Sequence, residues 1–223
     1  MIIPKLKAVF IHIPKTGGSA IDDAFDKAHQ SLENQLVWNW EHQRPPMFEY
    51  TYFPRKPIVV NKHATYDMMK PYYPDWAYLT QVRHPLTRWR SVFTFLKLRR
   101  MIRPETDFIE WTHRAIPACA KERLEDFIDE SETYNYWQVH FPIALNLHVM
   151  MFRQRYFLPK NKDDFSDIKI YKLEDQTIWK DWGLEPCFQM VSPEQYKQEA
   201  QYNSETKELV EEYFAEDMKV GNY

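Results

Sequence analysis

The sequence is poor in the residues on which several protein classes depend. Its 223 residues include only 4 Gly and 2 Cys. So few glycines argue against a Gly-rich β-sandwich. Two distant cysteines, with no CxxC pair and no Cys/His cluster, exclude a disulfide framework and a zinc site. We therefore expect two free thiols, Cys119 and Cys187, and no bound metal.

The sequence also lacks long hydrophobic runs and an excess of one charge. No apolar run approaches the roughly 18 residues that would span a membrane, and no signal-peptide pattern opens the chain. We expect a cytoplasmic protein with no membrane partner. The 29 Lys and Arg residues nearly balance the 32 Asp and Glu residues, for a net charge of −3. This balance does not indicate a nucleic-acid coat protein or an acidic disordered tail.

Apolar and aromatic residues are abundant. The hydrophobic fraction of 44% excludes disorder of the whole chain, and the aromatic fraction of 16% leaves rings for a pocket wall. The length, with no linker in sight, predicts one domain over 1–223. The aromatic segment 38–53 is predicted to be a loop that stacks a flat substrate, stacks a sugar face, or packs on the core.

Strand-like and helix-like patterns alternate along the chain. The hydrophobic pattern predicts strands over 8–13, 57–61, 77–82 and 168–173, and helices over 20–28, 85–96 and 206–220. Alternation of this kind is typical of a parallel sheet covered on both faces. The sequence therefore predicts an α/β fold, a three-layer sandwich with a central, mostly parallel sheet flanked by helices.

A phosphate-binding turn is predicted where the first strand meets the first helix. The segment 14–19 reads PKTGGS. Its two glycines allow the backbone to turn tightly and to direct successive N–H groups to one point, and the following helix adds the partial positive charge of its N-terminus. An ordinary strand-to-helix turn needs only the glycines. The addition of Lys15 and Ser19 favours an anion cradle.

The order of residues in this turn differs from that in ATPases and GTPases. Their loop reads GxxxxGK[ST], with the lysine after the last glycine, whereas Lys15 precedes Gly17. No predicted strand ends in an Asp suited to hold Mg²⁺, since the strand over 77–82 is followed by Arg83. A Mg-dependent nucleotide enzyme is therefore disfavoured.

A second anion site is predicted after the strand over 77–82. Arg83 stands at the end of that strand, where open α/β sheets bind ligands, and Ser91 follows about two helical turns later. From Arg83 to Arg103 the chain has seven Lys or Arg residues and no Asp or Glu. Arg83 and Ser91 favour a second phosphate site, and a solvated basic helix face is the alternative for Lys97, Arg99, Arg100 and Arg103. A nucleic-acid groove is the weaker interpretation because the charge is confined to one segment, so we expect no nucleic-acid partner.

Two anion sites on one sheet suggest a ligand phosphorylated at two places. Together, segments 14–19 (PKTGGS) and 83–91 (RHPLTRWRS) resemble the two signature segments of sulfotransferases that use 3′-phosphoadenosine 5′-phosphosulfate (PAPS). The resemblance is nearest to the branch that contains carbohydrate 2-O-sulfotransferases. Segment 170–175 (IYKLED) is similar to the family's strand-plus-acid segment, and 213–223 to its closing helix. Segment 101–165 matches little.

The resemblance implies a P-loop-like cradle, PAPS as donor, PAP as product and no metal. By position, the 5′-phosphosulfate would be held by Lys15, Thr16, Gly17, Gly18, Ser19 and Ala20. The 3′-phosphate would be held by Arg83 and Ser91. A sulfuryl group moves by in-line displacement, so catalysis needs chiefly positioning and charge stabilisation. We assign Lys15 to the charge that develops on the leaving phosphate.

A base must take the proton of the acceptor hydroxyl, and His63 is the predicted one. It follows the strand over 57–61, near the sheet edge of Lys15, and family members similarly carry a catalytic His after this strand. The pKa of a free histidine, about 6.5, suits this task. Lys62 is a candidate for steering anions, and Glu174 is a weaker alternative base. Five other histidines are expected to be structural: His12, His84, His113, His140 and His148.

The acceptor is the part of the function that the sequence determines least. We favour a small hydroxylated acceptor such as a phenol, because carbohydrate-modifying relatives usually carry a membrane anchor and this sequence shows none. An oligo- or polysaccharide is the alternative acceptor. Two other functions stay open, a Mg-dependent nucleotide kinase and a non-catalytic polyanion-binding module. The sequence does not indicate the oligomeric state.

Overall fold

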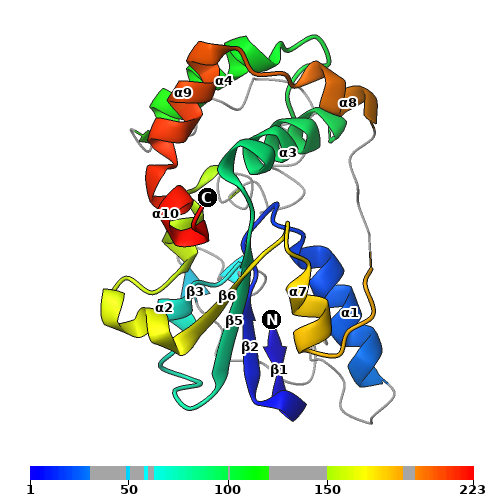
Figure 1. Cartoon of the computed structure of the whole chain (residues 1–223), viewed down its shortest axis with the longest axis vertical. Coiled ribbons are helices and arrows are strands. Elements are labelled where there is room, and N and C mark those ends of the chain that lie inside the picture. Colours follow the sequence, from blue (N-terminus) through cyan, green and yellow to red (C-terminus); the bar gives the residue numbers. More distant parts are fainter. Residues whose placement is uncertain (31–48, 51–57, 60–62, 100, 121–149, 188–193) are drawn as a thin grey trace. The chain divides into compact units, whose positions relative to one another are not determined.

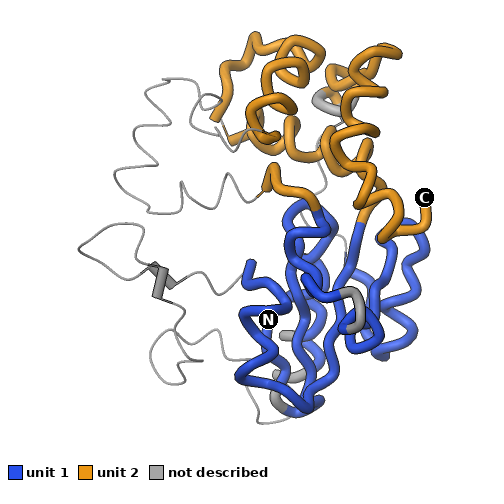
Figure 2. The backbone as a smooth tube through the Cα atoms, turned by 90° about the vertical axis from the view of Figure 1, so that its left-hand side faces the viewer, with its two compact units in different colours: residues 1–82, 154–190 blue, residues 83–153, 191–223 orange. Residues whose placement is uncertain are grey.

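The structure is a computed structural model, shown in Figure 1. It describes residues 1–30, 49–50, 58–59, 63–99, 101–120, 150–187 and 194–223. The chain divides into two compact units, coloured separately in Figure 2. Unit 1 comprises residues 1–82 and 154–190, and unit 2 comprises residues 83–153 and 191–223. The division into two compact units does not test the single domain expected over 1–223, which stays a prediction.

Unit 1 is built on a four-stranded sheet. In spatial order its strands are β1 (Ile2–Ile3), β2 (Ala8–Ile11), β5 (Ala77–Val82) and β6 (Ile168–Lys172). The strands β2, β5 and β6 run parallel, and β1 pairs antiparallel with β2. This confirms the predicted α/β class and its mostly parallel sheet, and β5 forms over the predicted residues.

Helices cover the sheet of unit 1 (Figure 1). Phe10, Leu79 and Tyr171, from three neighbouring strands, point to one face and share a buried core with α1 (Gly18–Gln30) and α7 (Thr177–Asp181). On β5, Tyr78 alternates with Leu79, and its ring meets that of Tyr66 in α2 (Tyr66–Met69) at 4.7 Å. Three short 3₁₀ helices belong to the same unit. Along the chain, η1 (Pro4–Leu6) lies between β1 and β2, and η3 (Gln154–Phe157) and η4 (Lys162–Asp167) precede β6.

The predicted strand over 57–61 forms in part, but outside this sheet. β4 (Ile58–Val59) pairs antiparallel with β3 (Glu49–Tyr50) as a separate two-stranded sheet. An antiparallel partner only a few residues earlier costs less loop-closure entropy than a crossover into a parallel sheet. The expectation that the strand over 57–61 belongs to the parallel sheet is therefore wrong.

Unit 2 is helical in its described residues. Its helices are α3 (Pro85–Leu98), α4 (Phe108–Ala120), α8 (Glu194–Glu199), α9 (Ser204–Tyr213) and α10 (Ala215–Gly221). The helix predicted to follow Pro85 is confirmed. The one helix predicted over 206–220 is instead two, because the backbone of buried Phe214 (φ −99°, ψ 23°) leaves helical geometry between them.

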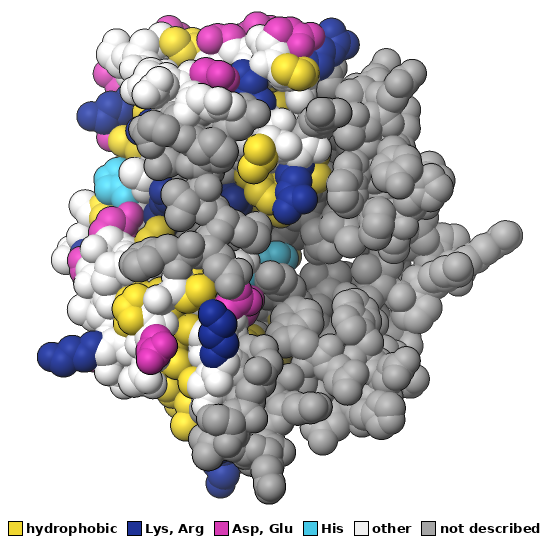
Figure 3. Space-filling view, turned by 90° about the vertical axis from the view of Figure 1, so that its right-hand side faces the viewer, with side chains coloured by type: hydrophobic (Ala, Val, Ile, Leu, Met, Phe, Trp, Pro, Cys, Tyr) yellow, Lys and Arg dark blue, Asp and Glu magenta, His cyan; other side chains and the backbone are white. Residues whose placement is uncertain are grey.

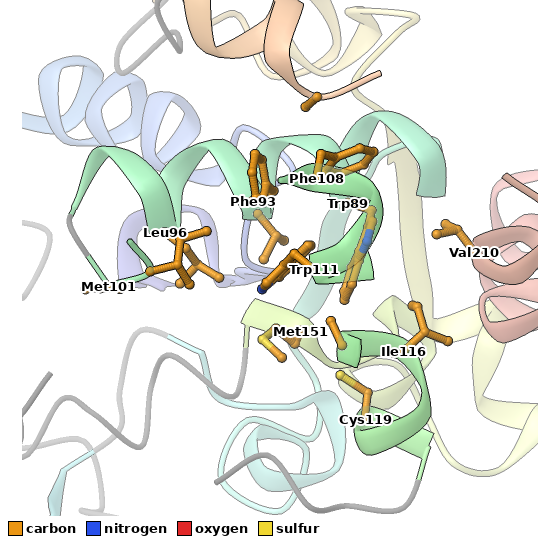
Figure 4. Close-up of a cluster of buried hydrophobic side chains, with 14 of the residues drawn as sticks. Trp89, Phe93, Leu96, Met101, Phe108, Trp111, Ile116, Cys119, Met151 and Val210 are labelled. Carbon is orange, nitrogen blue, oxygen red and sulfur yellow. The ribbon is translucent and has the colours of Figure 1, made fainter. Parts of the chain in front are cut away.

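An aromatic core holds unit 2 together, as Figure 4 shows. The Trp89 ring of α3 stacks on the Trp111 ring of α4 at 4.7 Å, and Phe93 lies against both Phe108 and Trp111. The Trp89 indole nitrogen also donates to Thr112 Oγ1 at 3.2 Å. The large apolar side chains of the 83–120 region therefore build this core, which offsets the entropy of ordering the helices in the described part of unit 2.

Some of the basic residues after β5 serve this core rather than a ligand. Arg88 is 1% exposed and donates from Nη2 to the carbonyl oxygen of Met150 at 2.9 Å. Burial lowers the pKa of its guanidinium to about 10, and the buried carboxylate of Asp217 opposes that shift. Lys97 pairs with Glu199 at 2.6 Å. The prediction of a solvated helix face is therefore wrong for Lys97, whose side chain is 10% exposed.

The surface view in Figure 3 shows acidic and basic side chains interspersed on one face of the described residues. No helix among the described residues combines the length and the apolar character that a membrane crossing requires.

Candidate functional site

The predicted anion cradle follows β2, a central strand of the sheet. β2 ends at Ile11, residues 14–17 form a turn, and α1 begins at Gly18, which confirms the predicted order of strand, turn and helix. Lys15 (φ +66°) and Gly17 (φ +84°) both adopt the left-handed backbone conformation. The turn thus lies at the carboxyl end of a parallel strand, the position at which open α/β sheets bind ligands.

Two buried polar side chains hold the turn from within. Thr16 is fully buried, and its Oγ1 donates to the carbonyl oxygen of Ile13 at 2.9 Å. Gln81 of β5, 1% exposed, donates from Nε2 to the carbonyl oxygen of Thr16 at 2.6 Å. A Cβ on Gly17 would lie 2.9 Å from that same nitrogen. Sequence reasoning missed Gln81, because its role depends on the register of β2 against β5.

His12 lies beneath the first turn of α1. Its ring is 4% exposed, and its Nδ1 lies 2.7 Å from Oδ2 of Asp22, whose side chain is 11% exposed. Because a carboxylate oxygen accepts, His12 Nδ1 carries the hydrogen. A Cβ on Gly18 would lie 2.5 Å from both Cδ2 and Nε2 of this ring. The predicted structural role of His12 is thus confirmed, and the ring occupies the space that a side chain at residue 18 would need.

Replacing Gly18 with Ala is therefore expected to destabilise unit 1. The added methyl group meets the His12 ring, which Asp22 holds in place, so either this ring or the first turn of α1 must move. Overpacking of this kind costs about 1–3 kcal/mol. Each kcal/mol should lower the Tm by roughly 2–4 °C, which thermal unfolding monitored by circular dichroism measures.

Gly183→Ala is the matched control for this change. Gly183 has φ +62°, and no atom of the described residues lies within 4 Å of the position that an added Cβ would take. It therefore bears the cost of a left-handed Ala, on the order of 1 kcal/mol, without a clash. A Tm of Gly18→Ala equal to or above that of the unsubstituted protein would contradict the packing of His12 under α1.

His63 lies beside the end of β2, as predicted, although it does not follow a strand of that sheet. Its Nδ1 lies 2.9 Å from the main-chain carbonyl oxygen of His12, and the two rings meet edge-on at 4.8 Å. A carbonyl oxygen only accepts, so Nδ1 of His63 donates, and the lone pair of the neutral ring lies on Nε2. The hydrogen bond thus fixes the tautomer that can act as a base through Nε2.

The remaining residues of the predicted cradle differ in exposure. Lys15 and Ser19 are half-buried, whereas Ala20 is 8% exposed and belongs to the core beneath α1. The amide of Ala20 donates to the carbonyl oxygen of Gly17 at 3.0 Å. Ala20 therefore supports the turn, and contact of these residues with a donor stays a prediction.

Arg83 and Ser91 belong to unit 2. Arg83 directly follows β5, is half-buried, and donates from Nε to Thr87 Oγ1 at 3.1 Å. Ser91 is half-buried in α3. His84 caps this helix, because its Nδ1 accepts from the amide of Leu86 at 3.3 Å. The binding of one phosphate by Arg83 and Ser91 stays a prediction.

The other candidates contribute less to this site. Glu174 is exposed in the turn after β6. Of the aromatic segment 38–53, the structure describes only Glu49–Tyr50, which form β3. Lys62 and the histidines His140 and His148 lie outside the described residues. His113 lies 3.8 Å from Glu205 in unit 2, consistent with the structural role expected of it.

The described site within unit 1 consists of three parts: the turn before α1, His63 and His12. A tight turn at the N-terminus of α1 presents a lysine, His63 offers an accepting nitrogen, and His12 connects the two through its backbone and its ring. Such a site can bind an anion and accept a proton. Comparisons of this chain with protein-family models, with curated proteins and with solved structures found no match.

Proposed function

We propose that this protein is a PAPS-dependent sulfotransferase that transfers the sulfuryl group to a hydroxyl of a small acceptor such as a phenol. The observation that carries the proposal is the hydrogen bond from His63 Nδ1 to the carbonyl oxygen of His12. This bond holds a basic nitrogen beside the strand end from which the Lys15 turn begins. A proton acceptor and an anion-binding turn are the two groups that transfer to a hydroxyl requires.

In this proposal the turn over 14–19 is a P-loop-like cradle on a three-layer sandwich. Lys15, Gly17, Gly18 and Ser19 hold the 5′-phosphosulfate with the help of the N-terminus of α1. Arg83 and Ser91 hold the 3′-phosphate. Thr16 and Ala20 act by shaping the turn, since the Thr16 hydroxyl and the Ala20 amide both donate to carbonyl groups of the turn itself.

The residues have distinct roles in the proposed reaction. His63 Nε2 takes the proton of the acceptor hydroxyl while that oxygen forms its bond to sulfur. The bond between sulfur and the bridging oxygen breaks, and both of its electrons stay with the leaving phosphate of PAP. Lys15 stabilises the charge that grows on this oxygen. The His12 carbonyl group, which accepts from Nδ1, favours the imidazolium formed at His63.

A non-catalytic polyanion-binding module fits the structure less well. That function would use the basic run from Arg83 to Arg103 as one surface. Arg88 is buried and Lys97 pairs with Glu199, so two of these cations serve the interior of unit 2. Fewer solvent-facing cations give a shallower dependence of polyanion binding on salt.

Ligand binding followed by a transfer assay tests the proposal. PAP at about 100 times its Kd should stabilise the protein by about 2.7 kcal/mol and raise its Tm, whereas ATP with Mg²⁺ should leave the Tm unchanged. The protein should then transfer label from ³⁵S-labelled PAPS to members of a panel of phenols, alcohols and sugars, with phenols preferred. A Tm raised by ATP with Mg²⁺ and not by PAP would favour the nucleotide kinase. PAP binding without transfer to any acceptor would contradict catalysis.

A further inference from the structure

We propose that His12 and Asp22 are positioning residues, which together hold the turn over 14–18 and the base His63 in one fixed arrangement. This inference rests on the proposed function, because it explains how the base is placed for transfer. Three contacts carry it. All involve His12, and all lie within unit 1.

The first two contacts fasten the His12 ring to α1. The ring fills the space beneath Gly18, so it supports the residue at which α1 begins. Asp22, four residues further along the same helix, accepts from Nδ1 at 2.7 Å. A ring held at two points of one helix, with 4% of the residue exposed, has little freedom to rotate.

The third contact transmits this arrangement to His63. The carbonyl oxygen of His12 accepts from His63 Nδ1 at 2.9 Å, and the edge of one ring meets the face of the other with an interplanar angle of 81°. His63 is therefore held by the backbone of residue 12 and packed against its side chain. Because the carbonyl group and the ring belong to one residue, a displacement of residue 12 moves both supports of the base, and the anchoring of its ring by Asp22 opposes such a displacement.

Asp22→Ala tests the proposal, and Asp22→Asn is its conservative partner. Removal of the carboxylate frees the His12 ring, and loss of a residue that orients a functional group in this way lowers turnover by about 10–100-fold. An Asn oxygen can still accept from His12 Nδ1, so Asp22→Asn should restore turnover to within about threefold. Asp23→Ala, the same change at the next residue of α1, should have no effect on turnover.

A double-mutant cycle separates positioning from general support of the fold. If Asp22 acts through His63, the effect of Asp22→Ala on kcat should vanish in a His63→Ala background. Equal losses in both backgrounds would overturn the proposal, since they would show that Asp22 acts without the base. Should Asp22→Ala fail to fold, His12→Asn provides the same cycle. Its amide nitrogen can donate to Asp22, but it lacks the ring that contacts Gly18 and His63.

A spectroscopic measurement tests positioning without any activity. In ¹⁵N NMR of the imidazoles, neutral His63 should be protonated at Nδ1 in the unsubstituted protein, and Asp22→Ala should mix this tautomer with the Nε2-protonated one. An unchanged single tautomer in both proteins would overturn the proposal. If the protein binds no PAP and transfers no sulfuryl group, the proposed function fails, while the tautomer measurement still decides whether His12 and Asp22 position His63.

Discussion

Lys15→Ala should lower the turnover of sulfuryl transfer by at least about 100-fold. Lys15 lies in the turn between β2 and α1, and in the proposed reaction its ammonium group stabilises the charge that grows on the leaving oxygen. Loss of one group that stabilises transition-state charge costs about 2.7–4 kcal/mol, or 10²–10³-fold in kcat. Single-turnover rates with labelled PAPS measure this loss directly, and PAP titration measures any accompanying loss of affinity.

Lys7→Ala is the matched control for this prediction. Lys7 also has a left-handed backbone (φ +46°), but it is exposed and precedes β2, whereas Lys15 follows it. The same substitution there should leave kcat unchanged. Lys15→Arg should recover only part of the rate, because a planar guanidinium does not reproduce the compact charge of an ammonium. Full turnover in Lys15→Ala would contradict the assignment of this lysine.

His63→Ala should lower kcat by about 10²–10⁴-fold, the range for loss of a general base. PAP affinity should change little, since the proposed base contacts the acceptor rather than the donor. The rate of the unsubstituted protein should fall as the pH decreases, because a proton on Nε2 blocks acceptance of the hydroxyl proton. In His63→Ala this acidic limb of the pH–rate profile should disappear, which steady-state kinetics over a pH series will reveal.

His63→Asn separates the loss of the base from the loss of the hydrogen bond to His12. The Asn amide nitrogen can take the place of Nδ1 and donate to the His12 carbonyl oxygen, so this variant should keep its stability yet be as slow as His63→Ala. His113→Ala, at a histidine of α4 in unit 2, should retain full activity. A variant at His63 that unfolds but keeps its rate per folded molecule would show that this histidine is structural.

Periodicity and turn chemistry were sufficient to predict the main elements near the site. The run AYLTQV predicts a buried strand and forms β5 over Ala77–Val82, and Pro85 begins α3 because proline suits the first turn of a helix. The separate pairing of β4 could not be predicted in this way. A strand of two residues shows almost no hydrophobic periodicity. Its pairing with β3 depends on the short connection between the two strands, which the hydrophobic pattern does not reveal.

The sequence predicted the turn and the side of the sheet on which His63 lies, but not the contacts that hold them. The PKTGGS segment indicates a turn before a helix, and this turn forms. The contacts of Gln81 and Asp22 were not predictable, because each depends on which side of its strand or helix faces the turn. The proximity of His63 to His12, 51 residues earlier, arises from a backbone carbonyl group that no side-chain motif reveals.

Under the proposed function, the left-handed backbone of Lys15 means that this position favours activity at the expense of stability. A residue with a Cβ at φ +66° costs on the order of 1 kcal/mol more than glycine does. Selection for thermostability alone would therefore favour glycine at residue 15, and the ammonium group of the lysine would be lost. In directed evolution toward heat resistance, residue 15 is a position where the better-folded sequence would be the poorer catalyst.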